Sequence, residues 1–365
     1  MTDTTATTAE LAGDHRSATG IVAAPGLVDA HIHPDKSSWG GPWMSRRRAG
    51  SLPEFIANDL ATQRAYTRSV EERAHALLST ALAQGTLAMR AHVDVSSELG
   101  TRNVEGVRAA AERLAPWLTV QIVAFPQFGL LTNPGTVEAM AAALDSGADL
   151  VGGIDPLGLE GDVDGHLDAV FGLAERAGRE IDIHLHDGGE PGLAQIREIA
   201  RRTRAAGLQG RVTVSHAFAL GDASLPTLGA TLDTVADAGV WIANCALGDD
   251  PVPDLDQLGR HGVRLVAGSD GVRDSWTPFG SGSMVDRAHL LAYRTGAMTD
   301  DELERCYRIC STEGASLIGV PDLAEFSGPE HPTRVEFAGE SIAQIVVDRP
   351  GPVSVIRDGL VFDRR

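Results

Sequence analysis

Eight short apolar segments, separated by stretches with helical spacing, limit the fold of this 365-residue chain more than any other feature. The segments are rich in β-branched residues and almost continuously apolar, as strands buried on both faces are. They occupy residues 26–33, 86–95, 118–127, 149–156, 180–187, 211–217, 240–246 and 264–270. Strand and helix repeated eight times predict an α/β protein with a (β/α)8 TIM-like barrel.

A doubly wound open sheet is the alternative fold for such a pattern. Its dinucleotide-binding form needs a Gly-x-Gly-x-x-Gly turn after the first strand, and no such turn follows residues 26–33. Helices are expected between the strands and after the last one, for example at 104–115, 164–178, 192–207, 286–296 and 299–319. The last two would close the barrel.

The pattern changes beyond Pro321, where short strand-like segments occur at 334–340, 341–348, 353–359 and 360–363. We therefore predict three parts. Residues 1–24 form an N-terminal segment that is partly disordered or β, residues 25–320 form the barrel, and residues 321–365 form a small, reduced β appendage.

Charge and composition exclude several classes of protein. The formal net charge of −19 would repel a polyanion, so no nucleic acid partner is expected. No apolar run approaches the ~20 residues that span a bilayer, and the first residues do not resemble a signal peptide. We expect no membrane partner and a cytoplasmic location. Cys245, Cys306 and Cys310 are too few for a disulfide framework and are expected to be buried thiols.

Histidines gather where the predicted strands end, which is where barrels of this kind carry their active sites. Six of the 12 histidines lie at the ends of four strands, namely His31, His33, His92, His184, His186 and His216. Other polar strand ends are Asp94, Gln127, Asp187, Ser215 and Asp270. A single histidine on an apolar strand is more often a core residue, so the interpretation rests on the whole pattern.

The His-x-His spacing favours a metal site. Side chains alternate along a strand, so His31 and His33 point to the same side. A third imidazole from His184 and a carboxylate from Asp270 complete a donor set that suits Zn²⁺ or Fe²⁺. His186 shares a face with His184, so one of them could bind metal while the other faces substrate.

Lys36 is the only lysine among the 31 basic residues, and it follows the His-x-His pair by three positions. Lysine is a compact charge on a flexible stem, whereas guanidinium is a planar fork. Because the chain otherwise uses arginine, its single lysine indicates a place where guanidinium does not fit. Chance is the alternative explanation.

Four motifs carry a family resemblance: PGLVDAHIHPDK at 25–36, QIVAFPQ at 121–127, SHA at 215–217 and GSDGVRDSWTPFG at 268–280. With them the sequence resembles the amidohydrolase superfamily, most closely its cytosine deaminase branch and the triazine-degrading members there. The resemblance implies a barrel of the metal-dependent hydrolase type. It also implies one divalent metal, Zn²⁺ or Fe²⁺, whose ligands are His31, His33, His184 and Asp270.

The resemblance assigns further roles. His216 falls on the histidine that orients the water, and Gln127 falls on the glutamine that reads the ring substrate. Binuclear relatives have a lysine at the end of the fourth strand, where this chain has GGIDP, so one metal is expected rather than two. Asp187 stands where cytosine deaminases have a proton-shuttling glutamate.

The mechanism expected from these residues uses water whose pKa a metal lowers to ~7. Asp270 would take the proton of this water, and Asp187 or His186 would protonate the departing nitrogen. Lys36, at the mouth of the site, would bind substrate and stabilise negative charge on an oxo-substituted ring.

Two aromatic residues after the eighth strand, Trp276 and Phe279, would bind substrate by covering the pocket; simple packing is the alternative. The expected activity is hydrolysis of an exocyclic C–N bond, by deamination or N-dealkylation, in a nitrogen heterocycle such as a pyrimidine or s-triazine. Ring-opening hydrolysis of a cyclic amide or imide is the alternative, and a metal-binding protein without turnover is a third hypothesis. The partner is a small heterocycle, and a homo-oligomer is left open.

Overall fold

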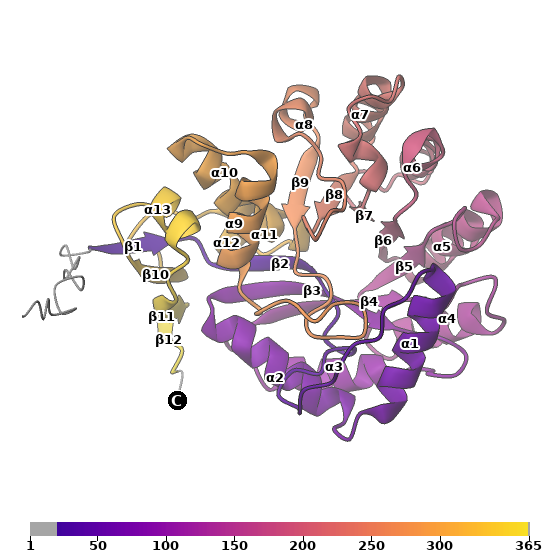
Figure 1. Cartoon of the computed structure of the whole chain (residues 1–365), viewed down its shortest axis with the longest axis horizontal. Helices are drawn as coiled ribbons and strands as arrows, with labels where there is room; N and C mark the ends of the chain where they lie inside the picture. The colour runs from indigo at the N-terminus through magenta and orange to yellow at the C-terminus, as the bar shows by residue number, and fades with distance from the viewer. Residues whose placement is uncertain (1–19, 364–365) are drawn as a thin grey trace, which may run out of the picture.

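The computed structural model describes residues 20–363 and contains the predicted barrel (Figure 1). Eight parallel strands are paired in chain order, and each lies within one of the eight predicted segments. The strands are β2 (Leu27–Ile32), β3 (Thr86–Asp94), β4 (Thr119–Phe125), β5 (Leu150–Ile154), β6 (Glu180–Leu185), β7 (Val212–His216), β8 (Trp241–Asn244) and β9 (Arg264–Ala267). The (β/α)8 prediction is therefore confirmed, and the open sheet is excluded.

The last strand meets the first at their carboxyl ends. Ile32 forms an isolated parallel bridge with Asp270, just beyond β9. The backbone N–H of Asp270 donates to the carbonyl of His31 over 2.7 Å, and the N–H of His33 donates to the carbonyl of Asp270 over 3.4 Å. This closure places the aspartate of the eighth strand beside the two histidines of the first.

Helices surround the strands and cover most of the outside of the barrel. They are α1 (Leu52–Ala65), α2 (Val70–Ala83), α3 (Arg102–Glu112), α4 (Thr136–Asp145), α5 (Val163–Ala177), α6 (Gly189–Ala205), η1 (Phe218–Gly221), α7 (Leu228–Asp237), α8 (Leu255–His261), α9 (Met284–Thr295), α10 (Asp300–Ile309), α11 (Thr312–Ile318) and α12 (Pro321–Ala324). The single helix expected at 299–319 is wrong, because the chain breaks at Ser311, whose φ and ψ are −142° and −97°. Among residues 20–363, no helix is both long and apolar enough to cross a membrane.

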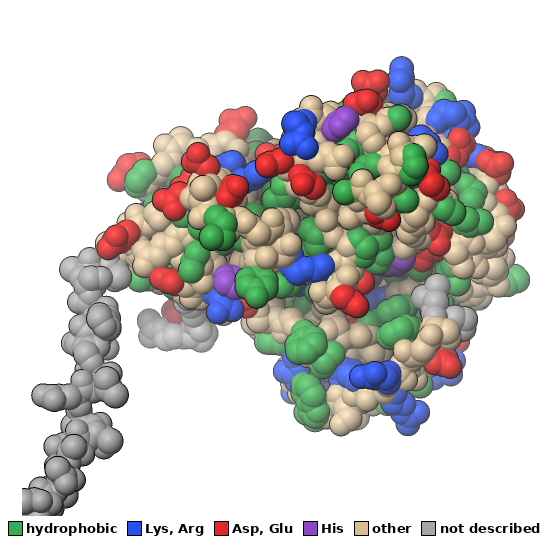
Figure 2. All heavy atoms as spheres, turned by 45° about the horizontal axis from the view of Figure 1, so that its top comes forward, with side chains coloured by type: hydrophobic (Ala, Val, Ile, Leu, Met, Phe, Trp, Pro, Cys, Tyr) green, Lys and Arg blue, Asp and Glu red, His purple; other side chains and the backbone are tan. Residues whose placement is uncertain are grey.

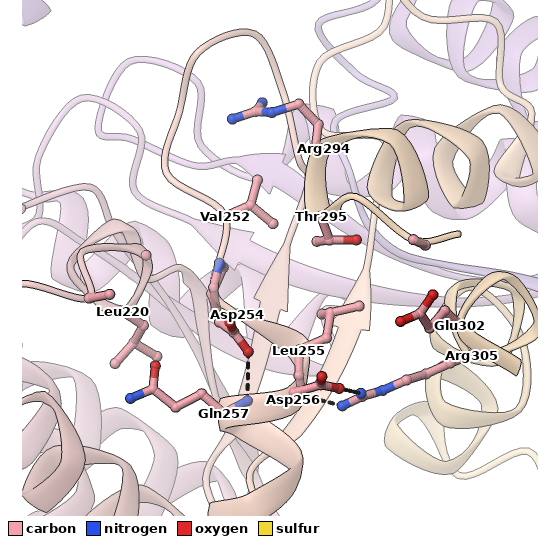
Figure 3. Close-up of a pocket in the computed structure, with 14 residues that line it drawn as sticks. Leu220, Val252, Asp254, Leu255, Asp256, Gln257, Arg294, Thr295, Glu302 and Arg305 are labelled. Carbon is pink, nitrogen blue, oxygen red and sulfur yellow. Dashed lines mark hydrogen bonds and ion pairs between the residues drawn. The ribbon is translucent and has the colours of Figure 1, made fainter. Parts of the chain in front are cut away.

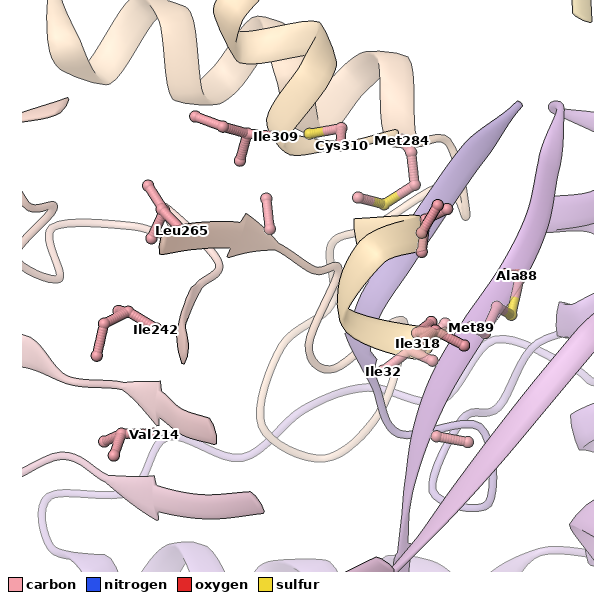
Figure 4. Packing of buried hydrophobic residues seen from close by; sticks show 14 of the residues in the cluster. Ile32, Ala88, Met89, Val214, Ile242, Leu265, Met284, Ile309, Cys310 and Ile318 are labelled. Carbon is pink, nitrogen blue, oxygen red and sulfur yellow. The ribbon is translucent and has the colours of Figure 1, made fainter. Parts of the chain in front are cut away.

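The main core lies between the strands and the helical layer. Val214, Ile242 and Leu265 follow one another on neighbouring strands, and Leu265 lies nearest to Ile309 of the last helices (Figure 4). All three cysteines are free and buried, as expected from the sequence. The layer therefore holds the strands rigidly, which is what a site assembled from several strand ends requires.

A small antiparallel sheet stands beside the barrel, at the left of Figure 1. Its strands, in spatial order, are β1 (Ile21–Ala24), β10 (Arg334–Ala338), β11 (Pro352–Arg357) and β12 (Leu360–Val361). The segment before the barrel thus contributes one strand to the appendage. Residues 1–19 of the predicted N-terminal segment lie outside the described residues, and the three-part division of the chain remains a prediction.

The strand expected at 341–348 is wrong, because these residues form α13 (Ile342–Asp348). The Ser341 side chain accepts from the N–H of Gln344 over 3.1 Å, and the Gln344 side chain accepts from the N–H of Glu340 over 2.8 Å. The Ser341 hydroxyl thus caps the first turn, and such a cap starts a helix. A short apolar run cannot be assigned to strand or helix by its periodicity alone, and here the cap decides.

The outer surface carries charged side chains of both signs (Figure 2). Acidic residues outnumber basic ones, 50 to 31, over the whole chain. Long arginine side chains pair with several of these carboxylates, as in the contact of Arg202 with Asp164 on α5 and α6. Such surface pairs contribute little to stability.

Candidate metal centre and active site

The histidines at the strand ends meet in one buried cluster. The ring of His31 lies at its centre, with ring centroids 3.9 to 5.2 Å from those of His92, His184, His216 and His33. His186 completes the group at its edge, 4.3 Å from the ring of His216. The structure therefore brings together all six histidines that the sequence singled out.

The backbone is strained where the chain leaves several strands. Five residues at these positions have positive φ although none is glycine: Asp155 (34°), His216 (68°), Ala217 (49°), Ala246 (50°) and Asp270 (58°). Such conformations cost on the order of 1–3 kcal/mol each, and they cluster at functional sites. The sharp turns aim His216 and Asp270 into the barrel mouth.

The hydrogen bonds of His33 leave a bare lone pair inside the cluster. Its Nδ1 lies 3.1 Å from the carbonyl oxygen of His92, which can only accept, so Nδ1 carries the hydrogen. Burial, with a contribution from Lys36, lowers the pKa of His33 to about 3 and keeps the ring neutral. The Nε2 lone pair then faces the Oδ1 of Asp270 at 3.2 Å. Two acceptors face each other, so a cation fits between them.

Two more imidazole nitrogens lie near this point. His31 Nε2 lies 3.6 Å from Asp270 Oδ1, is buried, and has no hydrogen-bond partner among the described residues. His184 Nε2 lies 3.3 Å from His33 Nε2.

The donor set therefore fits a divalent cation. His31, His33 and Asp270 offer ligand atoms within 4.8 Å of one another, and His31, His92 and His184 form a second such group. Imidazole nitrogens with one carboxylate suit zinc or iron. His92 was noted in the sequence as a strand end without a role, and it lies against the ligand candidates.

His186 is a protonatable group at the open edge of the cluster. Its Nδ1 lies 2.8 Å from Asp155 Oδ2, and its backbone N–H donates to Asp155 Oδ1 over 2.7 Å. Burial lowers the pKa of His186, but the Asp155 carboxylate outweighs burial and raises it overall. Sequence reasoning missed Asp155. The only signal was an aspartate at the end of the fourth predicted strand, in GGIDP.

Asp187 is used differently from its neighbour. Its Oδ2 accepts from the backbone N–H of Gly158 over 3.0 Å and from the side chain of Gln195 over 2.9 Å. The carboxylate thus links the loop after β5 to α6. From the sequence, Asp187 is expected to be needed for proton transfer, with His186 as the alternative. In the structure His186 lies against His216, whereas Asp187 binds the scaffold.

Lys36 is buried rather than at an open mouth, which corrects the expectation from the sequence. Its Nζ lies 3.2 Å from Asp94 Oδ1 and donates to Gln127 Oε1. Burial lowers the pKa of Lys36, but the carboxylates of Asp94, Asp59, Asp35 and Asp274 outweigh burial and raise it. The lysine is therefore a permanent cation within an acidic cluster.

Gln127 is oriented by this lysine. Because Lys36 donates to the carbonyl oxygen of the Gln127 amide, the amide nitrogen is left with two hydrogens to offer. The neighbouring Phe125 ring stacks on His184, with centroids 3.9 Å apart. The glutamine therefore lies close to the histidine cluster and presents donors rather than acceptors.

The two aromatic residues after β9 separate. Trp276 stacks on Phe55 of α1, with ring centroids 5.0 Å apart and planes 8° apart. Phe279 is 76% exposed. Trp276 thus joins two segments at the carboxyl end of the barrel, whereas the structure does not bring Phe279 to the site.

A cavity of about 270 Å³ lies elsewhere, beside α8, α9 and α10 (Figure 3). Its charged groups are already paired: Arg305 with Asp256 at 2.9 Å, and Asp254 with the N–H of Gln257 at 2.7 Å. A site with satisfied polar groups offers a ligand little to bind. The histidine cluster is therefore the better candidate.

The fold and the clustered ligands define a barrel hydrolase, and the amidohydrolase family matches residues 16–324 of this chain. The chain belongs to the amidohydrolase family, and it is an enzyme. Proteins of this family depend on a metal ion, which agrees with the donor set described above.

Two similar proteins share most of their length with this chain. N-isopropylammelide isopropyl amidohydrolase of Pseudomonas sp. (strain ADP) is 32% identical over an alignment of 359 positions, and the match covers 96% of this chain and 88% of that protein. The crystal structure of N-isopropylammelide isopropylaminohydrolase from Burkholderia multivorans has 38% identity and a TM-score of 0.88, and the match covers 94% of this chain and 86% of that one. These findings bear out the predicted resemblance.

A more distant structure shares the fold. The 5-methylcytosine deaminase of Klebsiella pneumoniae, liganded with phosphonocytosine, is 24% identical with a TM-score of 0.82. The match covers 94% of this chain and 87% of that one. At this identity the likeness concerns architecture alone.

Proposed function

We propose that this amidohydrolase uses one divalent ion, Zn²⁺ or Fe²⁺, to hydrolyse an exocyclic C–N bond of a nitrogen heterocycle such as a pyrimidine or s-triazine. The products would be an oxo-substituted ring and ammonia or an alkylamine. The observation that carries the proposal is the facing acceptor pair of His33 and Asp270, beside a protonatable His186. The N-isopropylammelide-hydrolysing relatives support the substrate class.

His31, His33, His184 and Asp270 would hold the ion. Bound there, a divalent ion makes hydroxide available at neutral pH by lowering the pKa of water. The Asp270 carboxylate lies 3.2 Å from His33 Nε2 and 3.6 Å from His31 Nε2, so it would stand where it can accept the proton of that water. His216 has a buried Nε2 without a partner among the described residues, so it can orient the attacking oxygen.

His186 would protonate the departing nitrogen. An amine is a poor leaving group until it gains a proton, so the reaction needs an acid at this point. Asp155 raises the pKa of His186, so this ring holds a proton more readily than a free imidazole does. With Nδ1 bonded to Asp155, Nε2–H is the atom available for the transfer. Asp187 is the alternative donor, and its bonds to Gly158 and Gln195 make it the weaker candidate.

Gln127 and Lys36 would select the ring. The Gln127 amide offers N–H donors, so the matching edge of the substrate carries a ring nitrogen or carbonyl oxygen. Lys36 supplies positive charge behind Gln127, which stabilises negative charge as it develops on such an oxo-substituted ring. Trp276, next to Lys36 at 5.9 Å, would cover this side of the substrate, and an equivalent role of Phe279 has no contact to support it.

A screen of released products tests this function. The chain, purified with zinc or iron, is incubated with amino- and alkylamino-pyrimidines, s-triazines and pterins, and ammonia, amine and ring products are measured. We expect amine or ammonia release with an intact ring. A ring-opened acid would establish the alternative cyclic amide hydrolysis. A metal-loaded chain that turns over none of these compounds would contradict the proposal. It would favour the third hypothesis, a metal-binding protein without turnover. Asp270→Asn serves as the inactive control.

A further inference from the structure

We propose that Ser215 and Asp182, backed by Arg90, are positioning residues that fix the protonation pattern of His31 and so set the affinity for the ion. The inference rests on the ion-binding part of the proposed function. It concerns atoms below the histidine cluster, inside the barrel. None of the three residues belongs to the ligand set.

The three residues form one buried line across the barrel interior. Arg90 lies on β3, Asp182 on β6 and Ser215 on β7, and each side chain is at most 1% exposed. Arg90 Nη1 lies 3.0 Å from Asp182 Oδ2. Ser215 Oγ lies 2.6 Å from Asp182 Oδ1 and 2.9 Å from His31 Nδ1. The chain of contacts thus runs from arginine to carboxylate to hydroxyl to imidazole.

Counting hydrogens gives this line a direction. The Asp182 carboxylate, paired with Arg90, can only accept, so the single hydroxyl hydrogen of Ser215 is donated to Asp182. Ser215 Oγ must then accept from His31, which requires the hydrogen of His31 to be on Nδ1. A neutral imidazole has only one such hydrogen. The Nε2 of His31 is therefore a free lone pair, as a metal ligand must be.

His31 differs in this respect from the other first-strand ligand. His33 is fixed by a backbone carbonyl, that of His92, which no side-chain substitution removes. The orientation of His31 depends on a hydroxyl instead. Partners of this kind typically contribute 10–100-fold to metal affinity. The side chain that orients His31 is therefore that of Ser215, the residue before His216.

Two variants of Ser215 test the relay. Ser215→Ala removes the oxygen that accepts from His31 Nδ1, so this contact no longer fixes the hydrogen on Nδ1 rather than on Nε2. We expect zinc affinity to fall about 10–100-fold. Ser215→Thr keeps a hydroxyl and should retain affinity close to that of the parent chain.

Thr213→Val is the matched control. Thr213 lies two residues earlier on the same strand, is equally buried, and accepts from Arg90 over 2.9 Å without contacting His31. The substitution removes a hydroxyl from the same network at nearly constant volume. We expect it to leave zinc affinity within about threefold of the parent, because the partner shell of His31 is unchanged.

The measurement is zinc dissociation by competition with a chromogenic chelator, together with the thermal midpoint of the metal-free chain. The relay predicts weaker zinc binding for Ser215→Ala alone, at metal-free midpoints similar to that of Thr213→Val. Equal zinc affinities of Ser215→Ala and Thr213→Val would overturn the relay. A loss of zinc affinity that parallels a lowered metal-free midpoint in both variants would overturn it as well. The zinc measurement involves no substrate, so it is independent of the product screen. If the screen finds no product while the zinc affinities of the two variants differ, the proposed reaction is contradicted and the relay is supported. A parent chain that binds no zinc or iron overturns both.

Discussion

Two buried ionic clusters lie side by side at the carboxyl end of the barrel, and they are built in opposite ways. The histidine cluster brings imidazole rings against one carboxylate, Asp270, and the Nε2 lone pair of His33 faces an oxygen of this carboxylate. The Lys36 cluster surrounds an ammonium group with the carboxylates of Asp94, Asp59, Asp35 and Asp274. The second cluster contains its own cation, whereas the first has a shape that requires one from outside.

The two clusters also respond to burial in opposite directions. In the histidine cluster burial lowers the pKa values of His33, His92 and His184, so these rings release their protons more readily than free imidazole. In the other cluster one lysine cannot compensate for four buried carboxylates, and burial raises the pKa values of Asp35, Asp94 and Asp274. The first cluster is therefore expected to bind metal, and the second to bind protons.

The largest effect is expected from opening the histidine cluster. Asp270→Ala removes the carboxylate that faces both His31 and His33, so ion and activity should both be lost. Elemental analysis of the parent should give about one zinc or iron per chain, and the variant far less. His75→Ala, on the surface helix α2, is the control. Two tightly bound ions per parent chain, or full metal content in Asp270→Ala, would contradict the single-metal site.

His186→Asn tests the acid at the edge of the same cluster. General acids typically contribute ~10²–10⁴-fold, so kcat should fall on that scale while the ion stays bound. Asp155→Asn should act in the same direction, because it removes the carboxylate that holds and charges the ring. Metal content and kcat are measured on the same preparations. Normal turnover in both variants would exclude His186 as the proton donor.

Lys36→Arg tests whether the second cluster needs this particular cation. The guanidinium keeps the charge but donates in a fixed fork, and the buried space around Gln127 and Asp94 is shaped for one ammonium. We expect kcat/KM to fall more than a hundredfold, which corresponds to ~3 kcal/mol, with the ion retained. Lys36→Met should show the same loss.

The effect of Lys36→Arg should be greatest on oxo-substituted rings and smallest on purely amino-substituted ones, since Gln127 and Lys36 act on developing negative charge. Steady-state kinetics on one substrate of each kind measures this. Parental activity of Lys36→Arg on both substrates would refute the argument from the single lysine.

The contrast between the clusters shows what the sequence could reveal. The histidine cluster was predictable, because strand periodicity and barrel closure bring His31, His33, His184 and Asp270 to one end without knowledge of any loop. The burial of Lys36 was not predictable. It depends on carboxylates from distant segments, such as Asp59 on α1 and Asp274 after β9, whose approach no local pattern specifies.

His186 and Asp187 mark the limit of the periodicity argument. The strand β6 ends at Leu185, so beyond it the alternation of side chains no longer fixes direction. Contacts with Asp155 and with Gln195 decide which of the two faces the cluster. Asp155 itself escaped notice because an aspartate before a proline is also a common turn residue.

The proton-binding character of the second cluster gives a pH dependence. Burial raises the pKa of Asp274 from 3.8 to about 7, so between these values the folded chain binds a proton that the unfolded chain has released. The contribution of Asp274 to the free energy of unfolding should therefore fall as the pH rises from 4 to 7 and level off above 7.

Asp274→Asn cannot ionise, and its amide oxygen can still accept from Trp276 and Thr277 as the carboxylate does. It should lack this decline, which amounts to a few kcal/mol. Urea unfolding of both metal-free chains at pH 5 and pH 8 measures the difference, in which the other titrating groups cancel. Equal pH dependence in the two chains would contradict the raised pKa.

The smallest effect is expected at Asp187, which lies beside the histidine cluster in sequence but outside it in space. In Asp187→Asn the amide oxygen can accept from Gly158 and Gln195 as Oδ2 does, so stability should change by at most ~1 kcal/mol. If His186 supplies the proton, kcat should stay within about threefold of the parent, far from the ~10²–10⁴-fold of a lost acid. Gln195→Leu is the matched control, because it removes a partner of Asp187 and leaves the carboxylate in place. A hundredfold loss in Asp187→Asn with the ion still bound, and none in Gln195→Leu, would move the acid from His186 to Asp187.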